Sequence, residues 1–332
     1  MGVNRLWSVI EYLSLSSNKI NNNINKRDLS GRVLAVDAVQ FIYRSINSKN
    51  KLHYHDKNLN NHILTIFNII YHSIMNNINT VWIFDSNVKS CELKKDTYTK
   101  RSNEKNDYKK KMEDCDLNQI ERDELYKKSY SLRTKHVNEV KKMLEMLGIP
   151  ILQASGEADI LCAEMNKQNL VDGVITDDWD GLLFGSEYII KYYNQNSKIY
   201  KMDDMLNLFN MNKNQFTDFC ILLGTDYNNP VSEQINPVDL YNLFIEHECN
   251  TEEIIRLLNP DPNNYLDRLE KVKKYYTNHI CDADFFTDID LSWKGIRDYD
   301  KLEDYLCNKF GLNNSEISSK LRKIGYQYKF LQ

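Results

Sequence analysis

Two short apolar runs, each ending in an aspartate, constrain the fold of this chain more than any other sequence feature. Arg32-Val-Leu-Ala-Val-Asp37 and Thr80-Val-Trp-Ile-Phe-Asp85 are continuously apolar over the length of a strand, which is typical of strands buried on both faces of a sheet. Helix-like segments at 39–46 and 63–75 separate the two runs. Alternating strands and helices predict an α/β fold with a mainly parallel sheet flanked by helices.

The alternation continues beyond residue 142. Strands are predicted at 149–153 and 173–176, with a helix over 157–166 between them. Gly148 is placed to cap the helix that precedes the first of these strands. Further helices are expected over 2–15, over 216–223 and through most of the chain after Asp226, and loops at 18–25 and 47–61.

Acidic residues gather where the predicted strands end. Ligands of parallel sheets bind beyond the carboxyl ends of the strands, so these acids are expected to share one edge. One acid at a strand end is usually a helix cap or a turn residue, and acids in a first helical turn are favourable in themselves. Several strand-end acids together predict a common site. The acids are Asp37, Asp85, Glu157, Asp159, Asp177, Asp178, Asp180 and Asp226.

The predicted acid cluster needs a counter-charge. Carboxylates about 4 Å apart repel by roughly 4 kcal/mol per pair at an effective dielectric constant near 20, so several would otherwise hold protons. Divalent cations remove this penalty, and Mg²⁺ favours sites with a few carboxylates and retained waters. Two such ions can activate a water and stabilise the leaving oxygen in phosphodiester cleavage.

Charge is unevenly distributed along the chain. The net charge is −4, but residues 94–142 hold fifteen Lys and Arg against ten Asp and Glu. This segment lacks Pro and Gly and predicts basic helices held away from the core, suited to nucleic acid. A solvated basic helix face is the alternative for each lysine taken alone.

Composition narrows the class of protein. No apolar run approaches the roughly 20 residues that span a bilayer, and the N-terminus lacks the layout of a signal peptide. The seven cysteines form no C-x-x-C pair, which argues against a zinc site or a disulfide framework. Reduced thiols favour an intracellular location, in the nucleus or the cytoplasm.

The ordered motifs resemble the flap endonuclease/XPG family over nearly the whole chain. Any one motif is weak, but the ordered set is specific. In chain order they are Met-Gly-Val…Leu-Trp, Val-Asp37-Ala, Phe-Asp85, Ser-Gly-Glu157-Ala-Asp159, Thr-Asp-Asp178-Trp-Asp180-Gly-Leu-Leu-Phe-Gly and Ile-Leu-Leu-Gly-Thr-Asp226-Tyr.

The resemblance implies a PIN-like fold with a helical arch and a C-terminal helix-two-turn-helix region. The expected segments, within one compact unit over 1–332, are an N-terminal nuclease region (1–93), a basic arch or gateway (94–142), an internal nuclease region (143–227) and a C-terminal helical region (228–332). It also implies a monomeric Mg²⁺-dependent 5′ nuclease, acting as a flap endonuclease and 5′–3′ exonuclease on branched DNA in replication, repair or recombination.

The family's seven metal-site acids carry over to this chain, where they are expected to hold two Mg²⁺ ions, with Mn²⁺ as a substitute. Asp159 replaces the usual Glu, and Asp177 is expected to lie outside the first shell of ligands. Asp180 is also taken as a catalytic residue. The seven acids are Asp37, Asp85, Glu157, Asp159, Asp178, Asp180 and Asp226.

The resemblance also implies substrate contacts. Lys94 and Arg101 match a Lys and an Arg, seven positions apart, that neutralise the scissile phosphate. The preceding loop is two residues longer than usual, so the competing candidates are Lys89, Lys95 and Lys100. Tyr43 matches an aromatic that stacks on a base, and a half-buried core aromatic is the alternative for it. Gly2 matches a glycine beside the active site.

Two departures from the family pattern change what is expected. Asn228 to Asp239 lacks the glycines of the turn that normally binds duplex backbone through a monovalent cation. The sequence therefore does not decide whether K⁺ binds there. No sliding-clamp peptide is found near Gln332, so clamp recruitment is not predicted. A minimal core of this kind suits a divergent or viral member acting in a host cell.

Two other functions compete with a DNA nuclease. A nuclease of the same fold could cleave RNA, because metal-assisted hydrolysis serves both nucleic acids. A non-catalytic scaffold for branched DNA is the third hypothesis, and retention of all seven acids argues against it.

Overall fold

The computed structural model describes residues 3, 5–17, 23–46, 60–86, 91–113, 116–191, 193, 196–278 and 289–331. The chain forms two compact units, each assembled from segments that are far apart in sequence. Unit 1 comprises residues 1–24, 89–97 and 159–287, and unit 2 comprises residues 25–88, 98–158 and 288–332.

Unit 2 is built on three parallel strands. They are β1 (Val33–Asp37), β2 (Asn79–Phe84) and β3 (Ile151–Gln153), and β2 pairs with both of the others. Asp37 lies opposite Ile83, and Phe84 lies opposite Gln153. The carboxyl ends of all three strands therefore meet at one edge.

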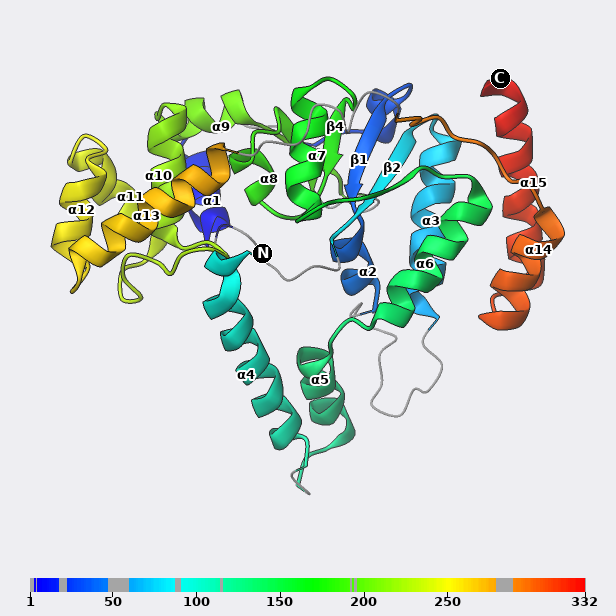
Figure 1. Ribbon diagram of the computed structural model, residues 1–332, viewed down its shortest axis with the longest axis horizontal. Coiled ribbons are helices and arrows are strands. Elements are labelled where there is room, and N and C mark those ends of the chain that lie inside the picture. Colours follow the sequence, from blue (N-terminus) through cyan, green and yellow to red (C-terminus); the bar gives the residue numbers. More distant parts are fainter. Residues whose placement is uncertain are drawn as a thin grey trace. The chain divides into compact units, whose positions relative to one another are not determined.

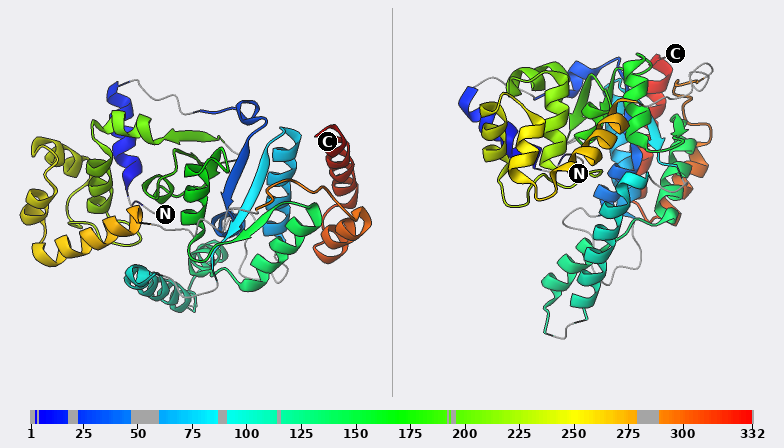
Figure 2. Two further views of the ribbon diagram at one scale, coloured as in Figure 1. Left: turned by 45° about the horizontal axis from the view of Figure 1, so that its top comes forward. Right: turned by 60° about the vertical axis from the view of Figure 1, so that its left-hand side comes forward.

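The helices of unit 2 cover these strands. They include α2 (Ala38–Ile46), α3 (Asn61–Met75) and α6 (Thr134–Leu147), and α3 contacts both α2 and α6. The C-terminal α15 (Asn314–Leu331) lies alongside α3 and α14 (Tyr299–Asp304), and the short π-helical turn η4 (Tyr305–Lys309) follows α14 (Figures 1 and 2).

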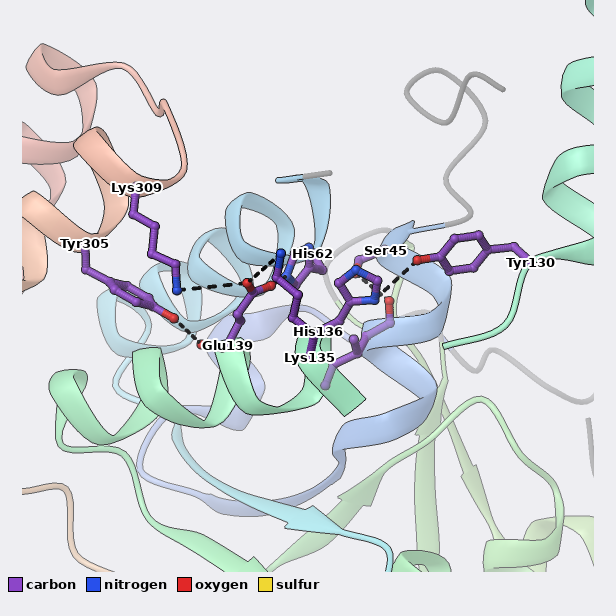
Figure 3. Close-up of polar contacts among 9 residues, drawn as sticks. Ser45, His62, Tyr130, Lys135, His136, Glu139, Tyr305 and Lys309 are labelled. Carbon is purple, nitrogen blue, oxygen red and sulfur yellow. Dashed lines mark hydrogen bonds and ion pairs between the residues drawn. The ribbon is translucent and has the colours of Figure 1, made fainter. Parts of the chain in front are cut away.

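A buried polar cluster joins α3, α6 and η4 inside unit 2 (Figure 3). The His62 Nε2 and Glu139 Oε2 atoms are 2.9 Å apart, and the ring of His136 lies edge-on to that of His62 at 4.9 Å. The Tyr130 hydroxyl is 3.3 Å from His136 Nδ1, and the Tyr305 hydroxyl donates to the carbonyl of Glu139. Burial is the main cause that lowers the pKa of each histidine to about 4.

Unit 1 holds the other three strands. They are β4 (Gly173–Ile175), β5 (Tyr188–Lys191) and β6 (Lys198–Lys201); β4 and β5 are parallel, whereas β5 and β6 are antiparallel. Three of the four strand pairings within the two units are thus parallel, as the sequence predicts. The pair of β5 with β6 was not predicted, since each strand has only four residues.

The helices of unit 1 are α1 (Leu6–Ser17), α7 (Ala158–Lys167, whose first residue belongs to unit 2), α8 (Asp180–Leu183), α9 (Met202–Phe209), α10 (Lys213–Leu223), α11 (Pro237–Glu246), α12 (Thr251–Leu258) and α13 (Pro262–Thr277). In all views α10 to α13 form one helical group (Figures 1 and 2). The helix-rich C-terminal part predicted from the sequence is confirmed.

The basic segment 94–142 contains two complete helices and the larger part of a third. The turn η2 (Glu92–Lys94) leads into α4 (Lys95–Lys111), and α5 (Gln119–Ser129) and α6 follow. All seventeen residues of α4 are described, and each is at least partly exposed. The expectation of helices held away from the core is right for α4 and wrong for α6, which buries Val140 and Met143 against its neighbours.

Other predicted elements also form. Gly148 caps α6 in the left-handed conformation, with φ +70°, as predicted. The predicted loops at 18–25 and 47–61 lie largely outside the described residues. In the part of the chain that is described, none of the helices has the length and apolar character needed to cross a membrane. The four predicted functional segments stay a prediction.

Candidate metal and nucleic-acid site

Three of the candidate acids belong to unit 2. Asp37 is the last residue of β1 and is buried, whereas Asp85 follows β2 and is exposed. Asp85 Oδ1 accepts a 2.8 Å hydrogen bond from the backbone N–H of Ala158, the first residue of α7. A carboxylate is favourable at this positive helix end. The bond brings Asp85 beside the half-buried Glu157, which precedes Ala158.

The end of β2 is fixed by a neighbouring side chain. Gln153, at the end of β3, donates from Nε2 to the carbonyls of Phe84 and Asp85. Lys141 Nζ in turn donates to Gln153 Oε1 at 2.6 Å and lies over the Phe84 ring. Gln153, which is itself bonded to Lys141, therefore fixes the backbone that carries Asp85.

The other four acids belong to unit 1. Asp178, Asp180 and Asp226 are buried, with at most 7% of each side chain exposed, and Asp159 is half-buried. A turn sets the first two: the N–H of Asp178 donates to Thr176 Oγ1, and the N–H of Asp180 donates to Asp178 Oδ1, both at 3.1 Å. The strand end at β4 thus leads directly into two adjacent carboxylates.

Electrostatic repulsion is strong in this part of the site. Burial, followed by the charges of Asp178 and Asp226, raises the pKa of Asp180 well above its ordinary value. Burial is also the main cause that raises the pKa of Asp178, and Asp226 adds to it. Lys94 and the Tyr276 hydroxyl act against this rise, because both lower the pKa of Asp180. The acids therefore favour a cationic partner.

A buried lysine, Lys191, lies near these acids. Lys191, on β5, is 3% exposed; its ammonium donates to the carbonyl of Asp177 and lies 4.0 Å from the centre of the Trp179 ring. Burial lowers the pKa of Lys191 to about 8, against the opposing effect of Asp178 and other nearby acids. Lys191 offsets part of the negative charge that burial concentrates here.

Asp226 lies in a tight turn next to the base of α4. Gly224 has φ +93°, and a Cβ there would lie 2.9 Å from the nitrogen of Pro230. The Thr97 hydroxyl donates to the carbonyl of Asp226 at 2.7 Å, and the Lys94 ammonium lies 4.5 Å from the centre of the Tyr227 ring. These contacts bring a candidate phosphate-binding lysine to the turn that carries a candidate metal ligand.

The donor chemistry of these acids suits a divalent cation. Carboxylate oxygens are the ligands that Mg²⁺ prefers, and burial, followed by repulsion, raises the pKa values of Asp178 and Asp180, an effect that such an ion would offset. Among the described residues, however, no three or more His, Cys, Asp or Glu side chains are grouped as a ready metal site. The sharing of ions by all seven acids therefore stays a prediction.

The structure separates the competing basic residues. Lys94 is half-buried over Tyr227, whereas Lys95 is exposed and pairs with Glu92 at 2.8 Å. Lys100 is exposed on α4 and Arg101 is half-buried there. Lys89 and Gly2 lie outside the described residues.

Tyr43 is half-buried on α2, and the Lys105 ammonium lies 5.8 Å from the centre of its ring. Lys105 belongs to α4, and burial together with the nearby charges of Arg101 and Lys109 lowers its pKa. Tyr43 thus lies beside a dense group of positive charges.

Three side chains of the site were not found from the sequence. Tyr276 donates to Asp180 Oδ1 at 3.1 Å, and Arg268 reaches the base of α4; both belong to α13. Nothing in the sequence around them marks a site. Lys191 left a weak signal, because it ends the apolar run Tyr188-Ile-Ile, where a charged residue is expected to need a partner.

Comparisons with known proteins give a consistent picture. The model of the XPG N-terminal domain matches residues 1–108, and that of the XPG I-region matches residues 148–226. Flap endonuclease 1 of Bos taurus is 25% identical over 98% of this chain and 86% of its own length. Flap endonuclease 1 of Picrophilus torridus is 26% identical over 96% of both chains.

The fold is also shared with solved structures. The catalytic core of Rad2 in complex with DNA substrate superposes with a TM-score of 0.71 and 21% identity, covering 97% of this chain and 100% of that chain. This likeness confirms the α/β fold predicted from the strand and helix pattern.

Proposed function

Because this chain belongs to the flap endonuclease/XPG family of nucleases, we propose that it is a Mg²⁺-dependent 5′ nuclease that cuts branched DNA. Flaps, gaps and junctions are the proposed substrates, and replication, repair or recombination is the proposed setting. The observation that carries the proposal is the burial of three carboxylates, Asp178, Asp180 and Asp226, in one unit, because burial and the repulsion that Asp178 and Asp226 exert on Asp180 favour a cationic partner.

The proposed metal ligands are the seven acids predicted from the sequence. Bound Mg²⁺ would supply activation of the attacking water and stabilisation of the leaving oxygen. The chain's own part is to hold the acids in place: Tyr276 orients Asp180, Ala158 fixes Asp85, and the turn at Gly224 presents Asp226.

Lys94 is the proposed partner of the scissile phosphate. It belongs to the same unit as Asp178, Asp180 and Asp226, and its charge lowers the pKa of Asp180. A cation at this place favours a phosphate and stabilises the negative charge that develops on it. Arg101, seven residues further along, is the second proposed cation, because its planar guanidinium can contact a phosphate through two bonds.

The basic residues of α4 are proposed to bind the DNA backbone. Burial lowers the pKa of Lys105, and Arg101 and Lys109 lie close enough for their charges to lower it further. Such a group gains free energy by releasing counterions from phosphates, so binding should weaken steeply with salt. Lys100 and Tyr43 are proposed to add a phosphate contact and a stacking contact, respectively.

Asp180→Asn tests the proposed function. The expected result is cleavage of a 5′ flap in Mg²⁺ reduced by orders of magnitude, with branched-DNA binding retained, because the amide keeps the shape and loses the charge. Asp177→Asn is the matched control, since Asp177 is half-buried in the same turn and is proposed to lie outside the metal ligands. Wild-type rates for Asp180→Asn would refute the assignment.

A second experiment tests which nucleic acid is the substrate. Wild-type protein is assayed on matched single-flap, double-flap, gapped and Holliday-junction DNA and on RNA flaps, with Mg²⁺, Mn²⁺ or EDTA. Faster cleavage of DNA flaps supports the proposal, whereas faster cleavage of RNA would replace DNA by RNA. Absence of turnover on every substrate with both metals would favour a branched-DNA scaffold.

A further inference from the structure

Helix α13 carries two polar side chains toward the site. Arg268 and Tyr276 are eight residues apart, which places them on one face of the helix, about 12 Å along its axis. Tyr276 contacts Asp180, as described above. Arg268 contacts a different set of atoms, all near the start of α4.

The guanidinium of Arg268 makes four polar contacts. Nε and Nη2 donate to the carbonyl of Tyr227 at 3.3 and 3.1 Å, and Nη2 also donates to the carbonyl of Leu93 at 3.1 Å. Nη1 lies 3.0 Å from Asp96 Oδ2. A planar guanidinium with several N–H donors can reach three partners at once, which a lysine ammonium does less well.

These contacts join segments that are far apart along the chain. Leu93 is 175 residues from Arg268 in sequence and precedes Lys94, and Tyr227 follows Asp226. Arg268 thus donates to the backbone next to Lys94 and to the backbone of Tyr227, the two residues whose side chains are in contact. The bond from Thr97 to the carbonyl of Asp226 closes the same junction.

The strength of the individual contacts indicates which of them matter. Asp96 is 65% exposed and Arg268 is 34% exposed, so their ion pair is screened by water and contributes little. The bonds to the two carbonyls are less exposed and fix backbone atoms. Loss of Arg268 would remove the bonds that join the carbonyls of Leu93 and Tyr227, and would leave the bond from Thr97 to Asp226 in place.

We propose that Arg268 is a positioning residue of the nuclease site, which holds the base of α4, and with it Lys94, against the turn that carries Asp226. The inference rests on the proposed role of Lys94 in cleavage. Arg268 is not proposed to touch the substrate; it acts through Lys94. Charge steering of DNA by Arg268 is the competing explanation, and the experiment separates the two.

The test uses the full-length protein and the variants Arg268→Gln, Arg268→Lys and Lys94→Ala, plus Arg268→Gln combined with Lys94→Ala. Arg256→Gln is the matched control: it removes the same charge from α12, where Arg256 pairs with the exposed Glu252. Single-turnover rates on a 5′ flap at saturating protein are measured with the KM for DNA. Hydrogen exchange over residues 91–99 is measured without DNA.

We expect Arg268→Gln to lower the single-turnover rate about 10- to 100-fold with little change in KM, because a displacement of about 1 Å can cost this much. Arg268→Lys should lie between, and Arg256→Gln should stay near the wild-type rate. In the Lys94→Ala background, Arg268→Gln should add less than about threefold, since positioning matters only while Lys94 is present. Exchange over 91–99 should accelerate in Arg268→Gln alone of the two glutamine variants.

Three results would overturn the proposal. Multiplicative rate losses of Arg268→Gln and Lys94→Ala would show that Arg268 acts independently of Lys94, and a rise in KM alone would assign it to DNA binding. Unchanged exchange over 91–99 would show that Arg268 does not hold the base of α4. The exchange result does not depend on cleavage, so failure of the proposed function is seen separately, as absence of wild-type turnover.

Discussion

The Tyr276 hydroxyl donates a 3.1 Å hydrogen bond to Oδ1 of Asp180, the first residue of α8. Tyr276 is 2% exposed, so the bond is shielded from water. Hydrogen bonds to a buried charged group are stronger than neutral ones and are costly to lose. One residue far along the chain therefore orients a candidate metal ligand and favours its charged form.

Removing this bond should weaken the site without unfolding the protein. Tyr276→Phe keeps the ring contacts with Phe184 and Tyr227 and deletes only the hydroxyl. We expect a cleavage rate about tenfold lower at limiting Mg²⁺, and a higher Mg²⁺ concentration at half-maximal rate, because removal of one charge-assisted bond costs about 1.5–3 kcal/mol. A Mg²⁺ titration of the flap cleavage rate measures this.

Tyr265→Phe is the matched control for that experiment. Tyr265 lies on the same helix, and its hydroxyl donates to the carbonyls of Ile221 and Asn229, not to an acid. Tyr265→Phe should lower thermal stability and leave the Mg²⁺ dependence unchanged. Equal shifts in Mg²⁺ dependence for both variants would contradict a specific role of Tyr276.

Two neighbouring lysines should differ in their effect on cleavage. Lys94→Ala should reduce the flap cleavage rate about 100-fold, because loss of one preorganised charge-stabilising group typically costs this much. Lys95→Ala should change the rate less than about threefold, since Lys95 is exposed and forms a surface pair with Glu92. Single-turnover rates measure both, and a larger loss for Lys95→Ala would move the proposed role to Lys95.

The acids at the strand ends were predictable because they follow from local pattern. Asp37 and Asp85 each end an apolar run, and such a run in an α/β protein places its last residue at the ligand-binding edge. The glycine cap of α6 was predictable for the same reason, since Gly148 follows the last residue of a periodic helix.

The residues that support those acids were not predictable. Tyr276 and Arg268 act across 96 and 175 residues of sequence, and no local period relates such positions. The error over α6 has a different cause: its charged residues share a helix with Val140 and Met143, and charge density hid an amphipathic pattern. The prediction for 94–142 treated the exposed α4 and the packed α6 as one kind of helix.

Gly148 also supports a prediction about stability. It has φ +70°, and a Cβ at this position would lie 2.2 Å from the carbonyl oxygen of Gly295. The same junction is held by bonds from the Trp293 indole to the carbonyl of Leu147 and from the Lys294 N–H to that of Gly148. Gly148→Ala should therefore lower the free energy of unfolding by roughly 3 kcal/mol or more, from backbone strain and displacement together.

Gly31→Ala separates those two causes. Gly31 has φ +81°, but a Cβ there would meet no atom within 4 Å. Its substitution should cost only about 1–2 kcal/mol of left-handed strain. Urea unfolding of both variants measures the difference, and equal losses would mean that contact with Gly295 adds nothing.

The buried histidines of unit 2 predict loss of stability in acid (Figure 3). Neutral His62 donates from Nε2 to Glu139, and its Nδ1 has no hydrogen-bond partner among the residues that the structure describes. A second proton on His62 would thus be buried without an acceptor, next to the positive charges of Lys135 and Lys309. His136 faces His62, Glu139, Arg133 and Lys135, and its pKa is also lowered to about 4.

The direction of the effect follows from the lowered pKa values. The unfolded chain binds protons on these histidines near pH 6.5, whereas the folded chain does so only near pH 4, so the unfolded state gains protons first as the pH falls. The stabilising contribution should be fully present above pH 6.5 and fall by about 2–3 kcal/mol for His62 alone between pH 6.5 and 4.

Urea unfolding at pH 7.5, 6, 5 and 4.5 measures how steeply the free energy of unfolding falls with pH. His136→Phe keeps an aromatic ring beside His62 and should make the slope shallower. The same slope in wild type and His136→Phe would exclude His136 as a source of the acid sensitivity.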